Sequence, residues 1–570
     1  MNRRIFPALS VVCGIVLSTA TIWSVEPSSM QHPSAVVGQR GMVVCVSPPA
    51  AEVGVAVLRR GGNAVDAATA VALALAVTFP EAGNIGGGGF MLIKPGDAAR
   101  EPVCIDYRET APAACSADTF VHETAQFGPR TVGVPGTIRG LELAHKQFGK
   151  LAWRELVLPA VALARDGFPL DVGTARALNG LVEKHAATFP EFARVYRKPG
   201  GAAWQAGDVL RQPDLAATLQ RLADDGPEEF YNGRTAELLV EEIRRGDGFI
   251  TRNDLRDYRA VSRKPVHGTY RGYDVYSSPP PSSGGTAIVA MLNILETFPL
   301  REQGRYDPRT LHLMTEAMRR AYADRARYLG DPDFVEIPSH LTTKEHARRL
   351  AATIVSDRAT PSIEVANDIP LADEGESTTH FSVIDADGMA VANTYTLQNS
   401  YGSLVVVHGA GFLLNNEMTD FNWRPGVTDR TGRIGTPANV VAPGKRMLSS
   451  QSPTIVTRDG RAVLVTGSPG GRTIPNTVLN VLLNVLEFDM ELDEAVAAPR
   501  SHHAWFPDVL RVESATGDRD AATLPQLRKW GHQVEAISGR QGDAHSILIR
   551  NGRVTGVADL RRSAATAVAE

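Results

Sequence analysis

The stretch ESTTHFSVIDADGMAVANTYTLQ, residues 376–398, lies two thirds of the way along a chain of 570 residues. Its centre, Asp385-Ala386-Asp387-Gly388, is typical of a turn. The residues on both sides alternate between polar and apolar, as the residues of half-buried strands do. The stretch therefore predicts a β-hairpin, with three hydroxyl groups and a histidine where its first strand begins.

The turn also predicts which residues of the two strands lie opposite each other. With the turn centred after Ala386, Thr378 lies opposite Tyr395. A one-residue bulge would place it opposite Thr396 instead. In both registers a second threonine lies beside Thr378.

A threonine at the start of a strand has two readings. On base rates, Thr378-Thr379 reflects the preference of threonine for strands. An unassisted hydroxyl is a poor nucleophile, but a cut of the chain immediately before Thr378 would create an α-amine with an ordinary pKa of about 7.7–8.0. That amine can act as the general base, as in enzymes with an N-terminal threonine. The residues alone leave both readings open.

The composition is that of an ordinary globular protein. The chain is 43% hydrophobic and 21% charged, and it is long enough for a large core or two domains. The net charge of -4 lacks the basic excess of a nucleic-acid-binding protein, and a basic pair such as Arg319-Arg320 fits the solvated face of a helix. We therefore predict no nucleic-acid partner.

The N-terminus has the pattern of a secretory signal. Arg3-Arg4 precedes the apolar run Ile5–Leu17, and the small residues Ser18-Thr19-Ala20 follow. The run is short for a membrane span, which needs about 20 residues. Cleavage near Ala20 is the first interpretation, and an uncleaved anchor extending to Val25 is the second.

We therefore expect residues 1–25 to be a signal peptide or an N-terminal anchor, and residues 26–40 to be a disordered leader rich in serine and proline. The protein is then periplasmic or secreted, or held at the membrane by its N-terminus. Another apolar segment, Ala67–Phe79, is too short to span a bilayer and predicts a buried helix.

Cysteine and histidine usage points to no metal. Apart from Cys13 in the apolar run, the chain has Cys45, Cys104 and Cys115. Cys104 and Cys115 could pair in an oxidising compartment, or all three could be buried thiols. The adjacent His502-His503 would point to opposite faces of a strand and chelate poorly. We expect no catalytic metal.

Helical and strand patterns alternate along the chain. Hairpins interleaved with helix pairs indicate a layered α/β domain rather than a TIM barrel or a regular βαβ array. Between Asp331 and Gly375 the pattern weakens, and prolines with an acidic run predict a linker. The predicted helices are Ala50–Arg60, Ala64–Val77, Arg139–Phe148, Glu155–Arg165, Pro213–Ala223, Ala236–Arg245, Ala287–Phe298, Arg309–Leu329 and Pro475–Leu486. The predicted strands are Gly41–Val46, Gly89–Ile93, Val103–Tyr107, Tyr273–Ser277, His380–Asp385, Ala390–Thr396, Thr454–Arg458, Ala462–Thr466, Leu510–Glu513 and His545–Arg550.

Two glycine-rich loops are candidates for ligand binding. Gly86-Gly87-Gly88-Gly89 follows a predicted helix and enters a strand, an order that fits neither a P-loop nor a dinucleotide fingerprint. We expect a tight connection there, in which larger side chains would clash. Ser468-Pro469-Gly470-Gly471 instead enters a helix, where free N–H groups can converge on an oxyanion, although a plain turn fits equally well. Thr466 occupies the first glycine position of a serine-hydrolase turn, which disfavours that class.

Further motifs are spread along the chain beside the hairpin. They are Gly61–Ala68, Gly86–Met91, Asp106–Glu109, Val134–Thr137, Leu163–Gly167, Pro280–Gly285, Thr378–Val383 with Gly388, Thr394–Thr396, Leu414–Phe421, Met447–Thr454, Gly467–Gly471 and Ala498–Arg500. Together they resemble the γ-glutamyltranspeptidases, N-terminal-nucleophile hydrolases that are made as one chain and cut themselves into two subunits. The resemblance covers residues 41–565. It implies a four-layer αββα sandwich, a large subunit 41–377 and a small subunit 378–570 that form a heterodimer, and no cofactor.

The resemblance also implies the catalytic residues. Thr378 would be the nucleophile, first in cleaving the Ser377–Thr378 bond and then in catalysis. Thr396 would bond the hydroxyl or the amine of Thr378. The N–H groups of Gly470 and Gly471 would form the oxyanion hole.

A second set of residues would bind the charged end of a γ-glutamyl group. Arg108 would hold the α-carboxylate with help from Ser449 and Ser450, because a guanidinium fork suits a carboxylate. Glu417 and Asp420 would hold the α-ammonium. Alone, each of these charged residues would be interpreted as a surface ion. Together they fit the two ends of a zwitterion, because desolvating either end without a partner is costly.

The chain departs from the pattern of many relatives at Gln398 and Thr431, and Glu417 stands where some bacterial members have glutamine, a variant that other members share. Gln398 stands where many relatives have asparagine, and we count it among the substrate-binding residues. Thr431 stands where the family's lid, here Asn422–Arg446, presents an aromatic residue to that asparagine. Both residues of this contact between lid and site differ from the family pattern. The balance between hydrolysis of the acyl-enzyme and its transfer to an acceptor therefore stays open.

We therefore expect a γ-glutamyltransferase and glutathione hydrolase. Thr378 would attack the amide of glutathione or another γ-glutamyl compound, and water, an amino acid or a dipeptide would resolve the acyl-enzyme. The alternatives are an amidase on the same scaffold, such as a cephalosporin, glutaryl or small-amide acylase, and an uncleaved, non-catalytic binding protein.

Overall fold

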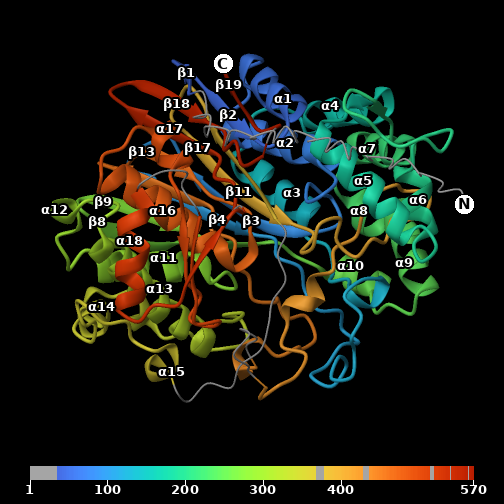
Figure 1. Ribbon diagram of the computed structural model, residues 1–570. Helices are drawn as coiled ribbons and strands as arrows, with labels where there is room; N and C mark the ends of the chain where they lie inside the picture. Colours follow the sequence, from blue (N-terminus) through green and yellow to red (C-terminus); the bar gives the residue numbers. More distant parts are fainter. Residues whose placement is uncertain (1–34, 367–377, 428–434, 514–518, 540, 563) are drawn as a thin grey trace, which may run out of the picture. The chain divides into compact units, whose positions relative to one another are not determined.

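The computed structural model describes residues 35–366, 378–427, 435–513, 519–539, 541–562 and 564–570 (Figure 1). Two seven-stranded sheets form its centre. All neighbouring strands of both sheets are antiparallel. Sheet 1 has the order β19 (Thr566–Ala569), β2 (Met42–Cys45), β10 (Thr379–Ile384), β11 (Ala390–Thr396), β3 (Gly88–Lys94), β4 (Val103–Asp106) and β7 (Val261–Arg263). Sheet 2 has the order β1 (Val36–Gly38), β18 (Arg553–Val557), β17 (Ser546–Arg550), β13 (Arg461–Thr466), β12 (Thr454–Arg458), β9 (Tyr273–Ser277) and β8 (Val266–Tyr270).

The two sheets pack face to face, because each contributes apolar side chains to one buried cluster. Phe90 and Leu92 of β3 meet Ile455 of β12 and Val465 of β13 there. The strands of the hairpin, β10 and β11, are buried along their whole length. With period-two alternation, one set of their side chains faces sheet 2 and the other set faces the helices.

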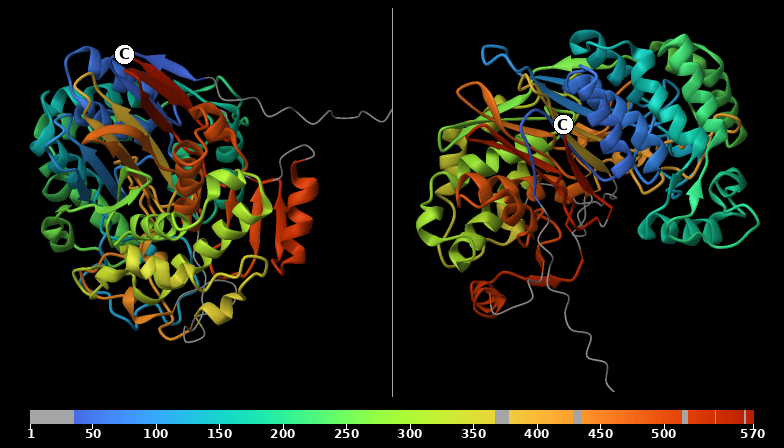
Figure 2. Two further views of the ribbon diagram at one scale, coloured as in Figure 1. Left: turned by 90° about the vertical axis from the view of Figure 1, so that its left-hand side faces the viewer. Right: turned by 90° about the horizontal axis from the view of Figure 1, so that it is seen from above.

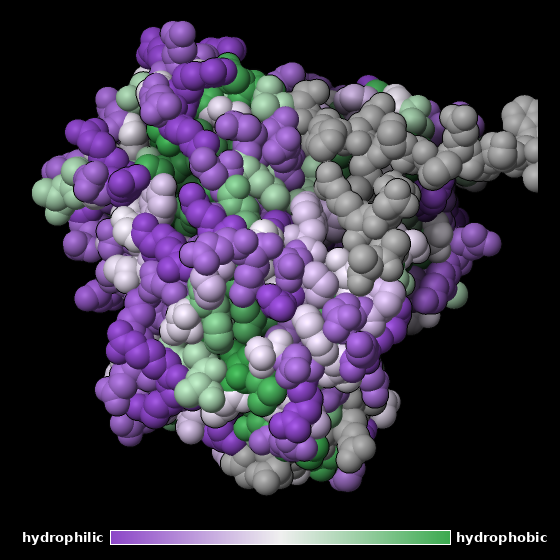
Figure 3. Space-filling view, turned by 60° about the vertical axis from the view of Figure 1, so that its left-hand side comes forward, coloured by the Kyte–Doolittle hydropathy of each residue, from purple (hydrophilic) through white to green (hydrophobic). Residues whose placement is uncertain are grey.

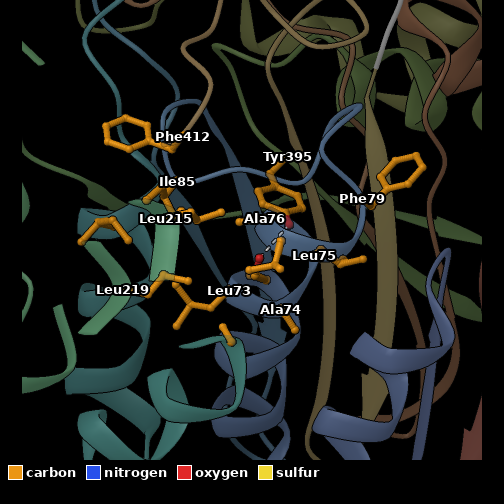
Figure 4. Close-up of a cluster of buried hydrophobic side chains, with 14 of the residues drawn as sticks. Leu73, Ala74, Leu75, Ala76, Phe79, Ile85, Leu215, Leu219, Tyr395 and Phe412 are labelled. Carbon is orange, nitrogen blue, oxygen red and sulfur yellow. Dashed lines mark hydrogen bonds between the residues drawn. The ribbon is translucent and has the colours of Figure 1, made fainter. Parts of the chain in front are cut away.

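A first layer of helices covers the outer face of sheet 1 (Figure 2). Its centre is α2 (Ala64–Thr78), which is buried on all sides, as expected for a helix that is apolar all round. Asn63 and Asp66 form a capping box at its start. Figure 4 shows α2 between Tyr395 of β11 and Leu215 of α7, and the Tyr395 hydroxyl donates to the Ala72 carbonyl oxygen (2.9 Å). The other helices of this half of the chain are α1 (Pro48–Arg59), α3 (Thr137–Phe148), α4 (Trp153–Asp166), α5 (Val172–His185), α6 (Pro190–Tyr196), α7 (Pro213–Asp225), α8 (Glu228–Asn232), α9 (Arg234–Arg245) and α10 (Arg252–Asp257).

A second helical layer packs on sheet 2 through another buried cluster. Its helices are α11 (Gly284–Leu295), α12 (Leu300–Gln303), α13 (Pro308–Tyr328), α14 (Lys344–Ala351), α16 (Ile474–Leu486), α17 (Leu492–Ala497) and α18 (Arg519–Lys529). Smaller elements complete the described chain: α15 (Ser362–Val365), the sheet of β14 (Ser501–His502), β15 (Leu510–Glu513) and β16 (Val534–Ile537), the pair β5 (Phe168–Pro169) and β6 (Val209–Leu210), and 3-10 turns at Pro129–Thr131, Ser339–Thr342, Glu417–Asp420, Pro437–Asn439 and Gly471–Thr473. The order helix, sheet, sheet, helix confirms the predicted four-layer αββα sandwich.

The predicted helices and strands are confirmed to within a few residues, but two predictions about irregular segments are wrong. Part of the supposed leader, Val36–Gly38, forms the edge strand β1 and pairs with β18. The supposed linker contains α14, whose Ala347 and Ala351 are buried against the second helical layer. Its proline-rich composition conceals a short helix that is stabilised by packing rather than by a long periodic pattern.

The glycine-rich connection from α2 into sheet 1 is confirmed as a close approach of backbones. A Cβ atom would lie 2.2 Å from the Leu413 carbonyl oxygen at Gly86, and 2.0 Å from the Thr396 carbonyl oxygen at Gly87. A side chain at Gly87 would therefore collide with β11 of the hairpin, and one at Gly86 with the segment around Leu413.

The surface fits the composition. Polar side chains predominate on the face shown in Figure 3, with apolar side chains in narrower strips. Among the described residues, no helix is both long enough and apolar enough to cross a membrane. The predicted N-terminal signal, residues 1–25, lies outside the described residues.

The fold predicts that the cluster between the two sheets carries a large part of the stability. Leu92 is completely buried there, and Leu92→Ala should lower the free energy of unfolding by about 2–5 kcal/mol. Val172→Ala, at a side chain that is 56% exposed, is the control and should change it by less than about 0.5 kcal/mol. Urea unfolding followed by circular dichroism measures both. Equal effects of the two substitutions would contradict this assignment of the core.

Candidate functional site

Thr378 lies immediately before β10, at the open end of the hairpin. Thr379 pairs with Tyr395 and Ile384 with Ala390, so continuing the register by one position places Thr378 opposite Thr396. Of the two predicted registers, the one with an extra residue in the turn is confirmed, so Thr378 lies opposite Thr396 rather than Tyr395.

The cause of this difference is the turn between the two strands. The Asp385 N–H donates to the Met389 carbonyl oxygen (3.1 Å), which leaves three residues in the loop. The Asp385 carboxylate accepts from the N–H groups of Asp387 and Met389 (3.0 Å each), and Gly388 takes a positive φ of 82°. A three-residue loop moves the centre of the hairpin to Asp387.

Thr378 borders a small buried cavity. Its side chain is on the same side of the hairpin as Ser382 and Ile384, the side that faces sheet 2. The residue is only 6% exposed. The cavity has a volume of about 20 Å³ and is lined by Arg108, Thr378, Thr396, Gln398, Asp420, Leu448, Ser449, Ser450, Gln451, Gly471 and Ile474. The structure therefore brings together residues from motifs that are hundreds of positions apart.

The loop after β13 reaches the same cavity, through Gly471. Gly470 and Gly471 have positive φ values of 126° and 53°, and α16 begins at Ile474. A Cβ atom on Gly470 would lie 2.4 Å from Thr473 Oγ1, which donates to the Gly470 carbonyl oxygen (2.8 Å). Glycine is required here, because the backbone adopts a left-handed conformation at the entry to a helix.

The charged residues form one buried cluster around Arg108. Its Nη1 lies 2.6 Å from Glu417 Oε2 and 3.6 Å from Glu109 Oε2, and its Nη2 contacts Asp420. Nη2 also donates to the Leu448 carbonyl oxygen (3.2 Å). One guanidinium therefore serves three carboxyl groups, and Arg108, Glu109 and Glu417 are no more than 1% exposed.

Burial dominates the protonation of this cluster. It raises the pKa of Glu109 and of Glu417 to about 8, against the opposing attraction of Arg108. Burial also disfavours the charged form of Arg108, but the carboxylates of Glu417 and Asp420 outweigh this effect and hold its pKa above the ordinary value. Burial thus pushes the two glutamates toward the protonated form while the guanidinium keeps its charge.

Gln398 connects Thr396, the residue opposite Thr378, with the charged cluster. Its N–H donates to Thr396 Oγ1 (2.7 Å), and its side-chain Nε2 donates to Asp420 Oδ1 (2.7 Å). Its φ is 77°, which is uncommon for a residue other than glycine. The position predicted to differ from relatives is therefore a direct neighbour of both parts of the site.

His380 is part of the strand rather than a catalytic base. Its two ring nitrogens lie 2.8 Å from Thr394 Oγ1 and 3.1 Å from Ser382 Oγ. Burial lowers its pKa well below the ordinary range, so the ring is neutral.

A second buried cluster could offer metal ligands. Ligand atoms of His312, Glu316 and His532 lie within 4.8 Å of one another. The Glu316 carboxylate, however, contacts the guanidinium groups of Arg319 and Arg320, so a divalent cation would lie beside two positive charges. The prediction that Arg319-Arg320 faces solvent is wrong, since both residues are buried to pair with Glu316.

The remaining predicted positions divide into two groups. The three cysteines of the described chain, Cys45, Cys104 and Cys115, are buried free thiols, which decides between the two readings of Cys104 and Cys115. Burial raises the pKa of the Cys45 thiol to about 12. Ser377 and Thr431 lie outside the described residues.

Comparisons with known proteins agree with this geometry. A sequence model described as Gamma-glutamyltranspeptidase matches residues 50–569. The chain belongs to the γ-glutamyltranspeptidase family. It is 43% identical to the "Glutathione hydrolase proenzyme" of Escherichia coli (strain K12), over 93% of this chain and 91% of that protein. It is 37% identical to the "Glutathione hydrolase proenzyme" of Bacillus subtilis (strain 168), over 93% of this chain and 91% of that protein.

Solved structures give the same assignment at the level of the fold. A γ-glutamyltranspeptidase of Helicobacter pylori is 40% identical with a TM-score of 0.52, over 55% of this chain and 91% of that chain. A cephalosporin acylase from Bacillus halodurans has a TM-score of 0.82 at 25% identity, over 96% of this chain and 99% of that chain. The sandwich is thus shared with an acylase, while sequence identity is higher with the γ-glutamyltranspeptidase family.

Sequence reasoning missed one member of the site, Glu109. It lies in the quoted motif Asp106–Glu109, next to Arg108, and that adjacency was the available signal. Its carboxylate packs against Gly88, where a Cβ atom would lie 2.6 Å from Glu109 Oε2. The close approach excludes water from the carboxyl group and explains its raised pKa.

Glu109 predicts a pH dependence of stability. In the unfolded chain its carboxyl group ionises near an ordinary pKa of about 4.3, whereas the folded protein holds the proton to about pH 8. Its contribution to the free energy of unfolding is therefore full at acid pH and is lost as the pH rises between these values. Glu109→Gln should gain stability relative to the wild type from pH 5 to pH 8, as measured by urea unfolding.

Glu52→Gln is the matched control, at an exposed glutamate of α1. It should leave the pH trend of the wild type unchanged. A Glu109→Gln protein whose stability follows the wild-type trend would show that Glu109 ionises in the folded state.

Proposed function

We propose that this protein is a self-processing γ-glutamyltransferase and glutathione hydrolase. The observation that carries the proposal is the single cavity that joins Thr378 to Gly471 and to the buried ion cluster of Arg108. The cavity combines a nucleophile, an oxyanion loop and charges of both signs. The names of the relatives, glutathione hydrolase proenzymes, support the same activity.

Processing begins at the bond between Ser377 and Thr378. The Thr378 hydroxyl attacks the preceding carbonyl carbon, and the resulting ester is hydrolysed. This cut releases the α-amine of Thr378, which becomes the general base. The products are a large subunit that ends at residue 377 and a small subunit of residues 378–570, which remain together as a heterodimer.

Catalysis repeats this chemistry on a substrate amide. The amine takes the proton of the Thr378 hydroxyl, whose oxygen attacks the γ-carbonyl carbon. The N–H groups of Gly470 and Gly471 hold the oxyanion, and Thr396 orients the nucleophile from the opposite strand. The leaving amine departs with the proton. Water, an amino acid or a dipeptide then attacks the γ-glutamyl ester and restores Thr378.

Substrate binding exchanges partners inside the charged cluster. The α-carboxylate of the substrate takes the guanidinium of Arg108, with Ser449 and Ser450 as further donors. The α-ammonium takes the carboxyl groups of Glu417 and Asp420, which now pair with Arg108. A zwitterion can enter in this way without leaving a buried charge unpaired.

The N-terminal sequence supports a periplasmic or secreted location. A signal peptide cut near Ala20 would release the protein, and an uncleaved N-terminus would anchor it. N-terminal sequencing of both subunits from the purified protein decides between the two, because the large subunit then begins either near residue 21 or at residue 1.

The nucleophile gives the first prediction of this proposal. Thr378→Ala should abolish both cleavage and turnover, leaving one full-length band on denaturing electrophoresis, because no hydroxyl is present to attack. Thr378→Ser should retain both at lower rates. Thr379→Ser, one residue further along β10 and on the opposite face, is the control and should leave both intact. Persistent cleavage or hydrolysis in Thr378→Ala would refute the assignment.

Substrate preference distinguishes the proposed activity from that of an acylase. An acylase is the alternative because the fold is similar to that of a cephalosporin acylase. γ-Glutamyl-p-nitroanilide and glutaryl-p-nitroanilide differ by the α-ammonium group. The wild type should hydrolyse the γ-glutamyl compound with a kcat/KM at least about tenfold higher, since an unpaired buried carboxylate is costly. Asp420→Asn should lower only that activity. Preference for the glutaryl compound would establish an acylase, and a single uncut, inactive chain would establish a binding protein.

A further inference from the structure

The segment Ser449-Ser450-Gln451 lines the cavity but belongs to no helix and no extended strand. Its hydroxyl groups can serve a substrate only if neighbouring elements fix their positions. Two neighbours do this, the turn before α11 and the guanidinium of Arg325 in α13.

The turn before α11 holds the backbone of the segment. The Ser449 N–H donates to the Pro281 carbonyl oxygen (2.9 Å), and the Ser283 N–H donates to the Ser449 carbonyl oxygen (2.8 Å). The Ser283 hydroxyl donates to the same oxygen (2.7 Å), and the Ser282 hydroxyl donates to the Gln451 carbonyl oxygen (2.5 Å). The Pro280–Gly285 motif thus holds the backbone of the cavity wall in place through hydrogen bonds.

Arg325 joins this turn to the side chain of the segment. Its guanidinium donates through Nε to Ser283 Oγ (2.8 Å) and through Nη2 to Ser450 Oγ (3.0 Å). The residue is 1% exposed. One rigid, planar cation therefore fixes the distance between the Ser283 hydroxyl, in the turn before α11, and the Ser450 hydroxyl.

These contacts occupy a lone pair of each serine hydroxyl and leave its hydrogen available for donation. A hydroxyl group has one hydrogen to donate and lone pairs to accept with. Ser450 Oγ accepts from Arg325, and Ser449 Oγ accepts from the Gln451 N–H (3.1 Å). Each O–H is thereby kept for donation elsewhere, and both residues line the cavity. A pair of hydroxyl donors suits an anion.

We propose that Arg325 is a positioning residue that presents the Ser449 and Ser450 hydroxyl groups as donors to the α-carboxylate of the substrate. The inference rests on the proposed function. Arg325 acts through Ser283 and Ser450, which distinguishes it from Arg108, whose guanidinium lines the cavity itself. It also assigns a role to the Pro280–Gly285 motif.

The test compares two substrates that differ only in the α-carboxylate, γ-glutamyl-p-nitroanilide and 4-aminobutyryl-p-nitroanilide. In processed Arg325→Gln protein, KM for the γ-glutamyl compound should rise about tenfold, with kcat within about threefold of the wild type, because a hydrogen-bond donor to an anion loses its orientation. The already weak hydrolysis of the 4-aminobutyryl compound should change by less than about twofold. Arg325→Lys, which keeps the charge but has one ammonium group, should give an intermediate KM.

A double-mutant cycle separates the effect of Arg325 on Ser450 from a general loss of structure. If Arg325 acts through Ser450, Arg325→Gln should add little to the rise in KM that Ser450→Ala causes. Arg309→Gln, at an exposed arginine of α13, is the matched control and should resemble the wild type. If Arg325→Gln fails to fold or to process, Arg325→Lys and Ser283→Ala carry the same comparison.

The outcomes separate the two proposals. Equal losses on both substrates, or additive effects in the cycle, would overturn the positioning role while leaving the proposed function intact. A wild-type protein that is processed but hydrolyses no γ-glutamyl compound would refute the proposed function itself, whatever the variants do.

Discussion

The antiparallel pairing of β10 with β11 is the constraint on which the site depends. Each step along a strand turns the side chain to the opposite face, so a register fixes the height and the direction of every side chain together. Here the register places Thr378 opposite Thr396 and turns Thr378 toward sheet 2. The Asp385 turn sets that register, and the glycines beside β3 let the neighbouring backbones approach closely enough to hold it. A defect in the turn would therefore displace the nucleophile without touching it.

The charged cluster shows a second principle, in which the protein buries three carboxyl groups around one guanidinium. One guanidinium faces three carboxyl groups in a dry interior, and two of these groups keep their protons well above the usual pH. The proposed zwitterionic substrate would bring one further charge of each sign to this cluster. A ligand with a single charge would bring only one of the two.

Much of this could be predicted from the sequence, and the failures have physical causes. The hairpin, the main helices and the glycine connection follow from local patterns in the chain. The register was predicted only as one of two alternatives, because the local pattern does not show whether the turn holds two or three residues, and the contacts of the Asp385 carboxylate go with the longer turn. The strand β1 was missed because three residues form a strand only when an existing edge pairs with them. In the site, the residues were found through their motifs, but the contact of Arg108 with Glu417 joins positions that only tertiary structure brings together. The raised pKa of Glu109 likewise depends on burial, which no local pattern reveals.

The distribution of strands between the two sheets has a consequence for the stability of the proposed two-subunit form. Each sheet contains strands from before Thr378 and strands from after it: in sheet 1, β10 lies beside β2 and β11 lies beside β3, and in sheet 2, β12 lies beside β9 and β18 beside β1. The proposed cut between Ser377 and Thr378 would therefore divide the covalent chain but no folding unit. The two pieces could separate only by breaking the hydrogen-bonded ladders inside the common core, so dilution alone would not part them. In this respect the heterodimer would dissociate as a single domain unfolds, and its lifetime would be governed by kinetic stability rather than by an ordinary binding equilibrium.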